Sequence, residues 1–225
     1  MFRSTIVATA VASALATASA TQAGFDGSSG ISFTQMMVGG GYVDFENPEG
    51  GYADFLVQAD PLPGSHLDAS ASHPDFGSLA AGISFGSFNN GVALFSFWSD
   101  LDAVPFGDLP YADIAFAGSR ISFTTTVPVL VTLIGSVQAT ETGVGFFELY
   151  ADDDIDGEFF TPGDNPVVFQ LELGPGSYDL AMGAAALALG GFGSFEGTLA
   201  ISVIPSPGAF ALLGAAGLLA RRRRR

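Results

Sequence analysis

The chain has 225 residues, of which 48% are hydrophobic and 13% are charged, and it contains no cysteine. Its Phe, Leu, Val and Ile content favours a folded domain over a disordered chain, and the lack of cysteine excludes disulfides, thiol catalysis and thiolate metal sites. Acidic residues number 23 against 7 Lys and Arg. This balance argues against nucleic acid binding, which needs basic side chains to displace phosphate counterions.

The N-terminus has the pattern of a secretory signal peptide. One positive charge at Arg3 precedes an uncharged run from Ile6 to Leu15, and small residues follow up to Ala20 and Ala23. A basic start, a short apolar run and a small-residue cleavage site are typical of export. We therefore expect residues 1–23 to be a signal peptide, cleaved after Ala20 or Ala23; a buried N-terminal helix is the alternative.

The basic residues are confined almost entirely to the two ends of the chain. Between them Arg120 is the one basic residue, whereas all 23 acidic residues lie in this part, and the chain has no lysine. Such a surface repels anionic lipid headgroups and attracts divalent cations.

The middle of the chain, residues 24–203, predicts many short strands. Apolar residues alternate with small polar ones, and Gly-, Pro- and Asn-rich breaks such as 47–51, 89–91 and 174–176 separate the runs. This pattern indicates an all-β fold, a single antiparallel β-sandwich of jelly-roll-like type. Glycines on both sides of 184–189 favour an Ala-rich strand there over a helix. The expected strands include 31–33, 83–85, 93–98, 121–123, 127–137, 145–150, 167–173, 178–182 and 198–204.

A short duplication predicts a hairpin near the start of this domain. The segment 41–45 is echoed by 51–55, and period-2 alternation places Tyr42 and Tyr52 on a face with aspartates. We favour a solvated sheet face; the alternative is a ligand-facing patch in which Tyr42 and Tyr52 stack on sugars.

The two histidines lie in a polar stretch, 61–78. His66 precedes Asp68, and His73 precedes Asp75. Two His with two Asp would suit a transition metal, but we expect a surface loop because no third His exists and Pro residues punctuate the stretch.

The only tryptophan, Trp98, lies in an apolar run. We therefore expect it in the core. The alternative is that Trp98, with Tyr111 and Tyr150, stacks on sugar rings, as aromatic faces do in carbohydrate-binding sandwiches.

An acidic run at 152–158 is the strongest chemical motif. Asp152, Asp154 and Asp156 alternate before Gly157, and Glu158 follows. Alternate carboxylates before a glycine open many calcium loops, so we expect these residues to bind calcium or, alternatively, to form an exposed turn. The twelfth loop position, where an EF-hand places Glu, is Gly163, so this is not an EF-hand.

The C-terminal segment, 204–225, has a distinct order of elements. Pro205, Ser206 and Pro207 precede a short apolar run that ends at Ala220, and five arginines close the chain: Arg221, Arg222, Arg223, Arg224 and Arg225. The apolar run predicts a short transmembrane helix with the arginines on the cytoplasmic side.

This order resembles the PEP-CTERM sorting signal. The resemblance implies an exosortase-like membrane enzyme as a processing partner and a link to exopolysaccharide production. Ser206 departs from the central acidic residue of the family pattern, which leaves the processing enzyme open. A plain stop-transfer anchor is the alternative.

Catalytic motifs are poorly represented in the chain. A serine triad would have to draw its base from the two histidines of the polar stretch, and the chain lacks a phosphate loop, so we predict no catalytic residues and no enzymatic activity. The sequence indicates a secreted, cell-surface or extracellular-matrix protein associated with exopolysaccharide and the membrane through its tail. The alternative is a carbohydrate-binding module or a glycoside hydrolase that uses paired carboxylates.

Overall fold

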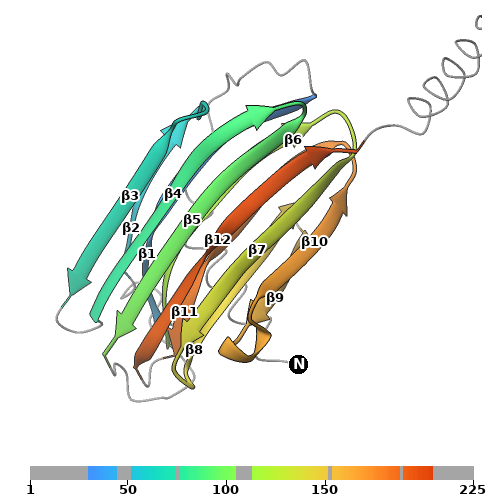
Figure 1. Ribbon diagram of the computed structural model, residues 1–225. Helices are drawn as coiled ribbons and strands as arrows, with labels where there is room; N and C mark the ends of the chain where they lie inside the picture. The colour runs from blue at the N-terminus through green and yellow to red at the C-terminus, as the bar shows by residue number, and fades with distance from the viewer. Residues whose placement is uncertain are drawn as a thin grey trace, which may run out of the picture.

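Two antiparallel sheets packed face to face make up the described part of the chain (Figure 1). The computed structural model describes residues 30–44, 52–73, 77–104, 113–151, 154–187 and 190–204. The first sheet has the strand order β2-β1-β6-β11-β8-β9, and the second has the order β10-β7-β12-β5-β4-β3. The elements are β1 (Ile31–Asp44), β2 (Tyr52–Ala59), β3 (His66–His73), β4 (Gly77–Asn89), β5 (Val92–Ala103), β6 (Asp113–Thr125), β7 (Val129–Ala139), β8 (Gly143–Ala151), β9 (Asp154–Phe160), a 3-10 turn η2 (Pro162–Asp164), β10 (Val167–Leu173), β11 (Gly176–Leu187) and β12 (Gly191–Val203).

The predicted all-β, sandwich-like architecture is confirmed. None of the described residues belongs to a helix with the length and hydropathy of a membrane span. The Ala-rich segment predicted as a strand lies in β11 up to Leu187. The turn between β4 and β5 has Asn90 at φ 53° and Gly91 at φ 76°, the left-handed pair that a two-residue hairpin turn requires.

Two stretches that we expected to lack regular structure are strands. Residues 66–73 form β3, which pairs with β4, so the prediction of a loop over 61–78 is wrong for this part. Residues 154–160 form β9 at the edge of the first sheet. In both stretches, main-chain pairing with a long neighbouring strand overrides the polar composition, because β-propensity depends on context.

Phenylalanine rings from both sheets fill the shared core. Phe33 of the first sheet lies 5.1 Å, between ring centroids, from both Phe85 and Phe95 of the second sheet. Phe85 and Phe95 stack on each other at 4.4 Å. Edge-to-face and offset contacts at these spacings add to the free energy of apolar burial.

The outer face of the first sheet carries a smaller apolar cluster. Its buried members are Met37, Ile114, Phe116, Phe146, Ala181 and Ala185. A row of glycines crosses β1, β6 and β11 on this face at Gly39, Gly118 and Gly183. A Cβ at Gly183 would lie 2.9 Å from the Phe146 ring, so the glycines leave room for phenylalanine rings to lie flat on the sheet.

Candidate functional site

The outer face of the second sheet is polar across most of its strands. Serines and threonines alternate with inward apolar residues, so hydroxyl groups cover the face beside a few carboxylates. Four consecutive strands, β3, β4, β5 and β12, align these side chains in rows by their register. One such row runs Asp68, Gly82, Trp98 and Glu196.

Trp98 lies on this outer face and is half-buried, so the expectation that it belongs to the core is wrong. On β5 the inward positions are Phe95, Phe97, Ser99 and Leu101, whose burial alternates with the exposure of their neighbours. Because strand side chains alternate with period 2, Trp98 must point outward once Phe97 points inward.

The nitrogen edge of the Trp98 indole lies over Gly82 of the neighbouring strand. A Cβ at Gly82 would lie 2.3 Å from Trp98 Nε1 and 2.4 Å from Asp68 Oδ1, so any side chain there would displace the indole or the carboxylate. From below, the Ser119 hydroxyl of the first sheet donates a hydrogen bond across the core to the Gly82 carbonyl at 3.2 Å. The Trp98 indole nitrogen and the Asp68 carboxylate therefore share the space that a side chain at Gly82 would take.

Carboxylates surround Trp98 on three sides. Asp68 lies beside it over Gly82, Glu196 is its partner on β12, and Asp100 follows two residues along β5 on the same face. All three carboxylates belong to exposed residues. The site thus joins an aromatic surface to a ring of hydrogen-bond acceptors.

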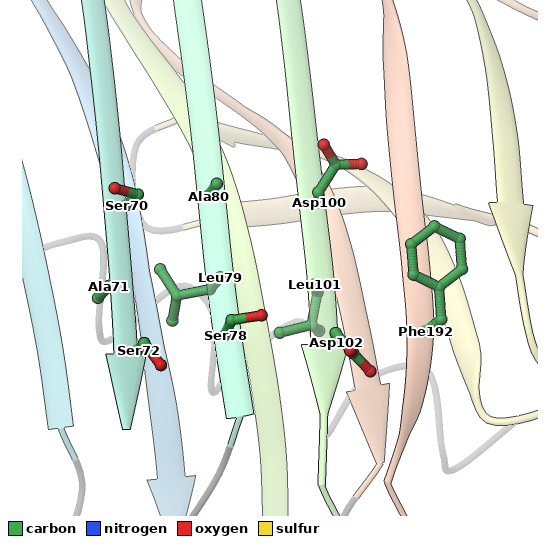
Figure 2. Close-up of a pocket in the computed structure, with 10 residues that line it drawn as sticks. All are labelled: Ser70, Ala71, Ser72, Ser78, Leu79, Ala80, Asp100, Leu101, Asp102 and Phe192. Atoms are coloured by element: carbon green, nitrogen blue, oxygen red, sulfur yellow. The ribbon is translucent and has the colours of Figure 1, made fainter. Parts of the chain in front are cut away.

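A shallow groove of about 510 Å³ continues from this site along the same face. Figure 2 shows it between β3, β4, β5 and β12, with the Asp100 and Asp102 carboxylates and the Phe192 ring along it. Serine hydroxyls from β3 and β4 line its other side. The lining residues are Ser70, Ala71, Ser72, Ser78, Leu79, Ala80, Asp100, Leu101, Asp102 and Phe192.

A second polar cluster lies on the outer face of the first sheet, around Arg120. This residue forms an ion pair with Asp179, and its guanidinium carbon lies 5.7 Å from the centroid of the Tyr150 ring. The Tyr150 hydroxyl donates a hydrogen bond to Glu148 Oε2 at 2.5 Å. Glu148 is 0% exposed, and its Oε1 has no hydrogen-bond partner among the residues that the structure describes.

Burial raises the pKa of Glu148 to about 7, although the hydrogen bond from Tyr150 opposes this shift. Burial and the neighbouring Glu148 carboxyl raise the pKa of Tyr150 above its usual value. Glu148 therefore exchanges its proton close to neutral pH. Apolar side chains such as Phe146 flank it on the same strand, so this cluster is suited to setting stability rather than to holding a ligand.

Of the five aromatic residues predicted to stack on sugars, the three with described side chains, Trp98, Tyr42 and Tyr150, lie on different faces of the sandwich. The predicted hairpin is confirmed, since Tyr42 of β1 pairs with Tyr52 of β2. The Tyr42 side chain is partly buried against the core of the sandwich, and the Tyr52 side chain lies outside the described residues. Tyr111 is also outside them, and Tyr150 lies on the first sheet. Of this set, only Trp98 is placed on the polar face.

The histidines belong to a strand rather than to a loop. His66 Nε2 lies 2.5 Å from Asp68 Oδ2 on the solvent side of β3. The side chain of His73 and all of Asp75 fall outside the described residues. Within the described ranges, no three His, Asp or Glu side chains are grouped as a metal site would need.

The acidic run predicted to bind calcium is only partly described. Asp152 and the side chain of Asp154 lie outside the described residues, whereas Asp156 and Glu158 are exposed on β9. In an extended strand, alternate side chains share a face about 7 Å apart. Residues 154–160 are therefore an extended strand rather than a loop. Calcium binding by the acidic run stays a prediction. Residues 1–29 and 205–225, with the predicted leader and sorting tail, also lie outside the described residues.

Sequence reasoning did not single out Asp100, Glu196, Glu148 or the pairing of Arg120 with Asp179. The alternation of side chains along β5 could have shown that Trp98 points outward, because Trp98 shares its face with Ser96, Asp100 and Asp102. No such signal placed Glu196 beside Trp98, because their proximity depends on the pairing of β5 with β12, strands distant in the chain.

Comparison with known proteins leaves the family open. No protein-family model and no curated protein matches the chain. Among solved structures, TmCBM61 in complex with beta-1,4-galactotriose matches at 6% identity and a TM-score of 0.27, over 60% of this chain and 88% of that one. The mosquito-larvicidal Cry4Aa toxin from Bacillus thuringiensis matches at 9% identity and a TM-score of 0.23, over 78% of this chain and 43% of that one. At these TM-scores neither likeness supports a shared fold or a shared ligand.

The pKa of Glu148 generates a prediction for stability. A carboxyl whose pKa rises on folding favours the native state below its unfolded value, and this contribution is lost as pH rises through the folded value. Between pH 4.5 and about 7, the native protein should lose about 3 kcal/mol of unfolding free energy through this group. We expect Glu148→Gln to flatten the pH dependence of chemical unfolding by that amount.

Glu172→Gln is the matched control, because it removes an exposed carboxyl on β10. Its pH profile should follow that of the unmodified protein, including the growing repulsion among other carboxylates. Parallel profiles for Glu148→Gln and the unmodified protein would contradict the assignment.

Proposed function

We propose that the protein is an exported, non-enzymatic surface or matrix protein that binds extracellular polysaccharide through the outer face of the second sheet. The observation that carries the proposal is Trp98, a half-buried aromatic residue on the polar outer face, with its indole nitrogen over Gly82 and with Asp68, Asp100 and Glu196 on neighbouring positions of that face. An aromatic side chain at the surface stacks on the apolar face of a sugar ring.

The polar surroundings of Trp98 suit a hydroxylated polymer. Carboxylates accept hydrogen bonds from sugar hydroxyls, and serine hydroxyls both donate and accept them. The groove extends the site beyond Trp98 to Asp102 and Phe192, which gives an elongated surface rather than a closed pocket. An open, elongated surface fits a chain of sugar units better than a single small molecule.

A glycoside hydrolase is the second candidate, and one observation favours it. Asp68 and Glu196 place carboxylates on opposite sides of Trp98, and such enzymes act with two carboxyl groups that flank the scissile bond. Both residues are exposed, whereas a general acid needs an environment that raises its pKa. We therefore place binding first.

Export and sorting complete the proposal. Residues 1–23 would serve as the signal peptide, and 204–225 as a PEP-CTERM-like tail with a short transmembrane helix that an exosortase-like enzyme processes. The jelly-roll-like description of the sandwich is supported by the connections β6–β7, β10–β11 and β11–β12, each of which passes from one sheet to the other. Calcium at the acidic run, where Asp152 and Asp156 lie, would assist association with the polysaccharide.

Replacing Trp98 tests the binding face. We expect Trp98→Ala to weaken binding to the extracellular polysaccharide of the native host at least tenfold, because central aromatic residues contribute about 2 kcal/mol or more to interfaces. Affinity electrophoresis over a panel of soluble polysaccharides measures the loss.

Ile134→Ala is the control, since Ile134 is a 53% exposed apolar residue elsewhere on the same face. It should change affinity by no more than about twofold. Equal binding by Trp98→Ala and the unmodified protein would place the ligand elsewhere, and release of oligosaccharides during incubation would establish the hydrolase.

Intact-mass analysis of the mature protein from its native host tests the sorting proposal. We expect a species that begins after Ala20 or Ala23 and ends near Pro205, because processing would remove the apolar run and the arginines. A mature protein that retains Arg225 would instead indicate a simple membrane anchor.

A further inference from the structure

We propose that the polysaccharide carries free amino groups, and that a protonated amine lies beside the Trp98 indole between the carboxylates of Asp68 and Glu196. This inference rests on the proposed function and names the class of sugar polymer that the face would select. It follows from the charge of the face and from the position of its carboxylates around the indole.

The charge of the second sheet's outer face excludes a direct fit to acidic sugars. Arg120 is the one basic residue between the two ends of the chain, and it lies on the other sheet, paired with Asp179. On the polar face, the nearest group able to carry positive charge is His66, which contacts Asp68. Among the described residues of this face, a uronate or sulfate would therefore meet several carboxylates and, as a possible cationic partner, only His66.

The geometry around Trp98 suits an ammonium group. The indole face attracts cations through its quadrupole, and the Asp68 carboxylate lies beside the indole nitrogen over Gly82. Glu196 is the cross-strand partner of Trp98 on β12, where Cβ atoms approach to about 5 Å; its Oε1 accepts a hydrogen bond from Ser136 of β7 at 3.5 Å. Three N–H donors of an ammonium group would find acceptors on both sides of the ring.

The acidic positions also continue in one direction. Along β5, Trp98 is followed on the same face by Asp100 and Asp102, and both aspartates line the groove (Figure 2). Each exposed ion pair is weak by itself. A polymer that repeats an amine on successive sugars engages several carboxylates together, so the contributions accumulate along the chain.

A panel of matched polymers tests the inference. The pairs are chitosan with its N-acetylated form, and β-1,6-linked polyglucosamine with its N-acetylated form; cellulose oligomers and alginate are the neutral and acidic members. We expect the mature full-length protein to bind the amine form of at least one pair about tenfold more tightly than its acetylated form. This preference should shrink as salt screens the charges.

Two double variants distinguish recognition of the amine at the Trp98 site from general attraction by the protein's negative net charge. Asp68→Asn with Glu196→Gln should abolish the preference for the amine form while leaving binding that still depends on Trp98. Asp54→Asn with Glu141→Gln removes the same two charges from exposed positions away from this face, on β2 and in the turn between β7 and β8, and it should retain the preference. All measurements are made in chelator, so that calcium does not bridge the acidic members.

The outcomes distinguish this inference from the function on which it rests. Binding through Trp98 with no preference for the amine form, or with a preference for alginate, would overturn the inference and leave polysaccharide binding intact. If both double variants lost the preference for the amine form equally, the preference would come from net charge alone, and the inference would also be overturned. No binding to any polymer or to the native polysaccharide would overturn both.

Discussion

Each strand of the sandwich must direct alternate side chains into one shared core, and this constraint decides what both outer faces display. The core takes phenylalanines from both sheets, including Phe33, Phe85 and Phe95. Once these rings point inward, the residues between them on each strand must point outward, because strand side chains alternate between the two faces. Trp98 is therefore on the surface because Phe97 is in the core, and Asp100 and Asp102 share its face for the same reason.

The two outer faces meet this constraint in opposite ways. On the first sheet, phenylalanines such as Phe146 lie over a row of glycines, and a buried Glu148 among them has a pKa raised to about 7. On the second sheet, hydroxyls and carboxylates remain exposed around one indole. Arg120 belongs to the first of these faces, and among the described side chains of the second face His66 is the one basic residue. Because the fold places Arg120 on one outer face and a group of exposed carboxylates on the other, the second face should prefer a cationic ligand.

Much of the fold was predictable from the sequence, because alternation and turn residues are local signals. The strands around Phe85, Leu133 and Leu180 were expected, as was the Asn90-Gly91 turn. The strands β3 and β9 were not, because main-chain pairing with β4 and β8 outweighs their polar composition. At the site, Trp98 and Asp68 were named in advance, but the preferred placement of Trp98 in the core and of Asp68 in a loop was wrong. Asp68, Glu196 and Trp98 meet through register between distant strands, which no local pattern encodes.

Because Trp98 is the only tryptophan, its fluorescence reports on the polar face alone. The most direct measurement is a titration of the mature protein with the native polysaccharide, followed by tryptophan emission and by hydrogen exchange of the backbone. We expect a saturable change in emission together with added protection confined to β3, β4, β5 and β12. Saturable binding with unchanged emission, and with protection on the outer face of the first sheet instead, would contradict this expectation.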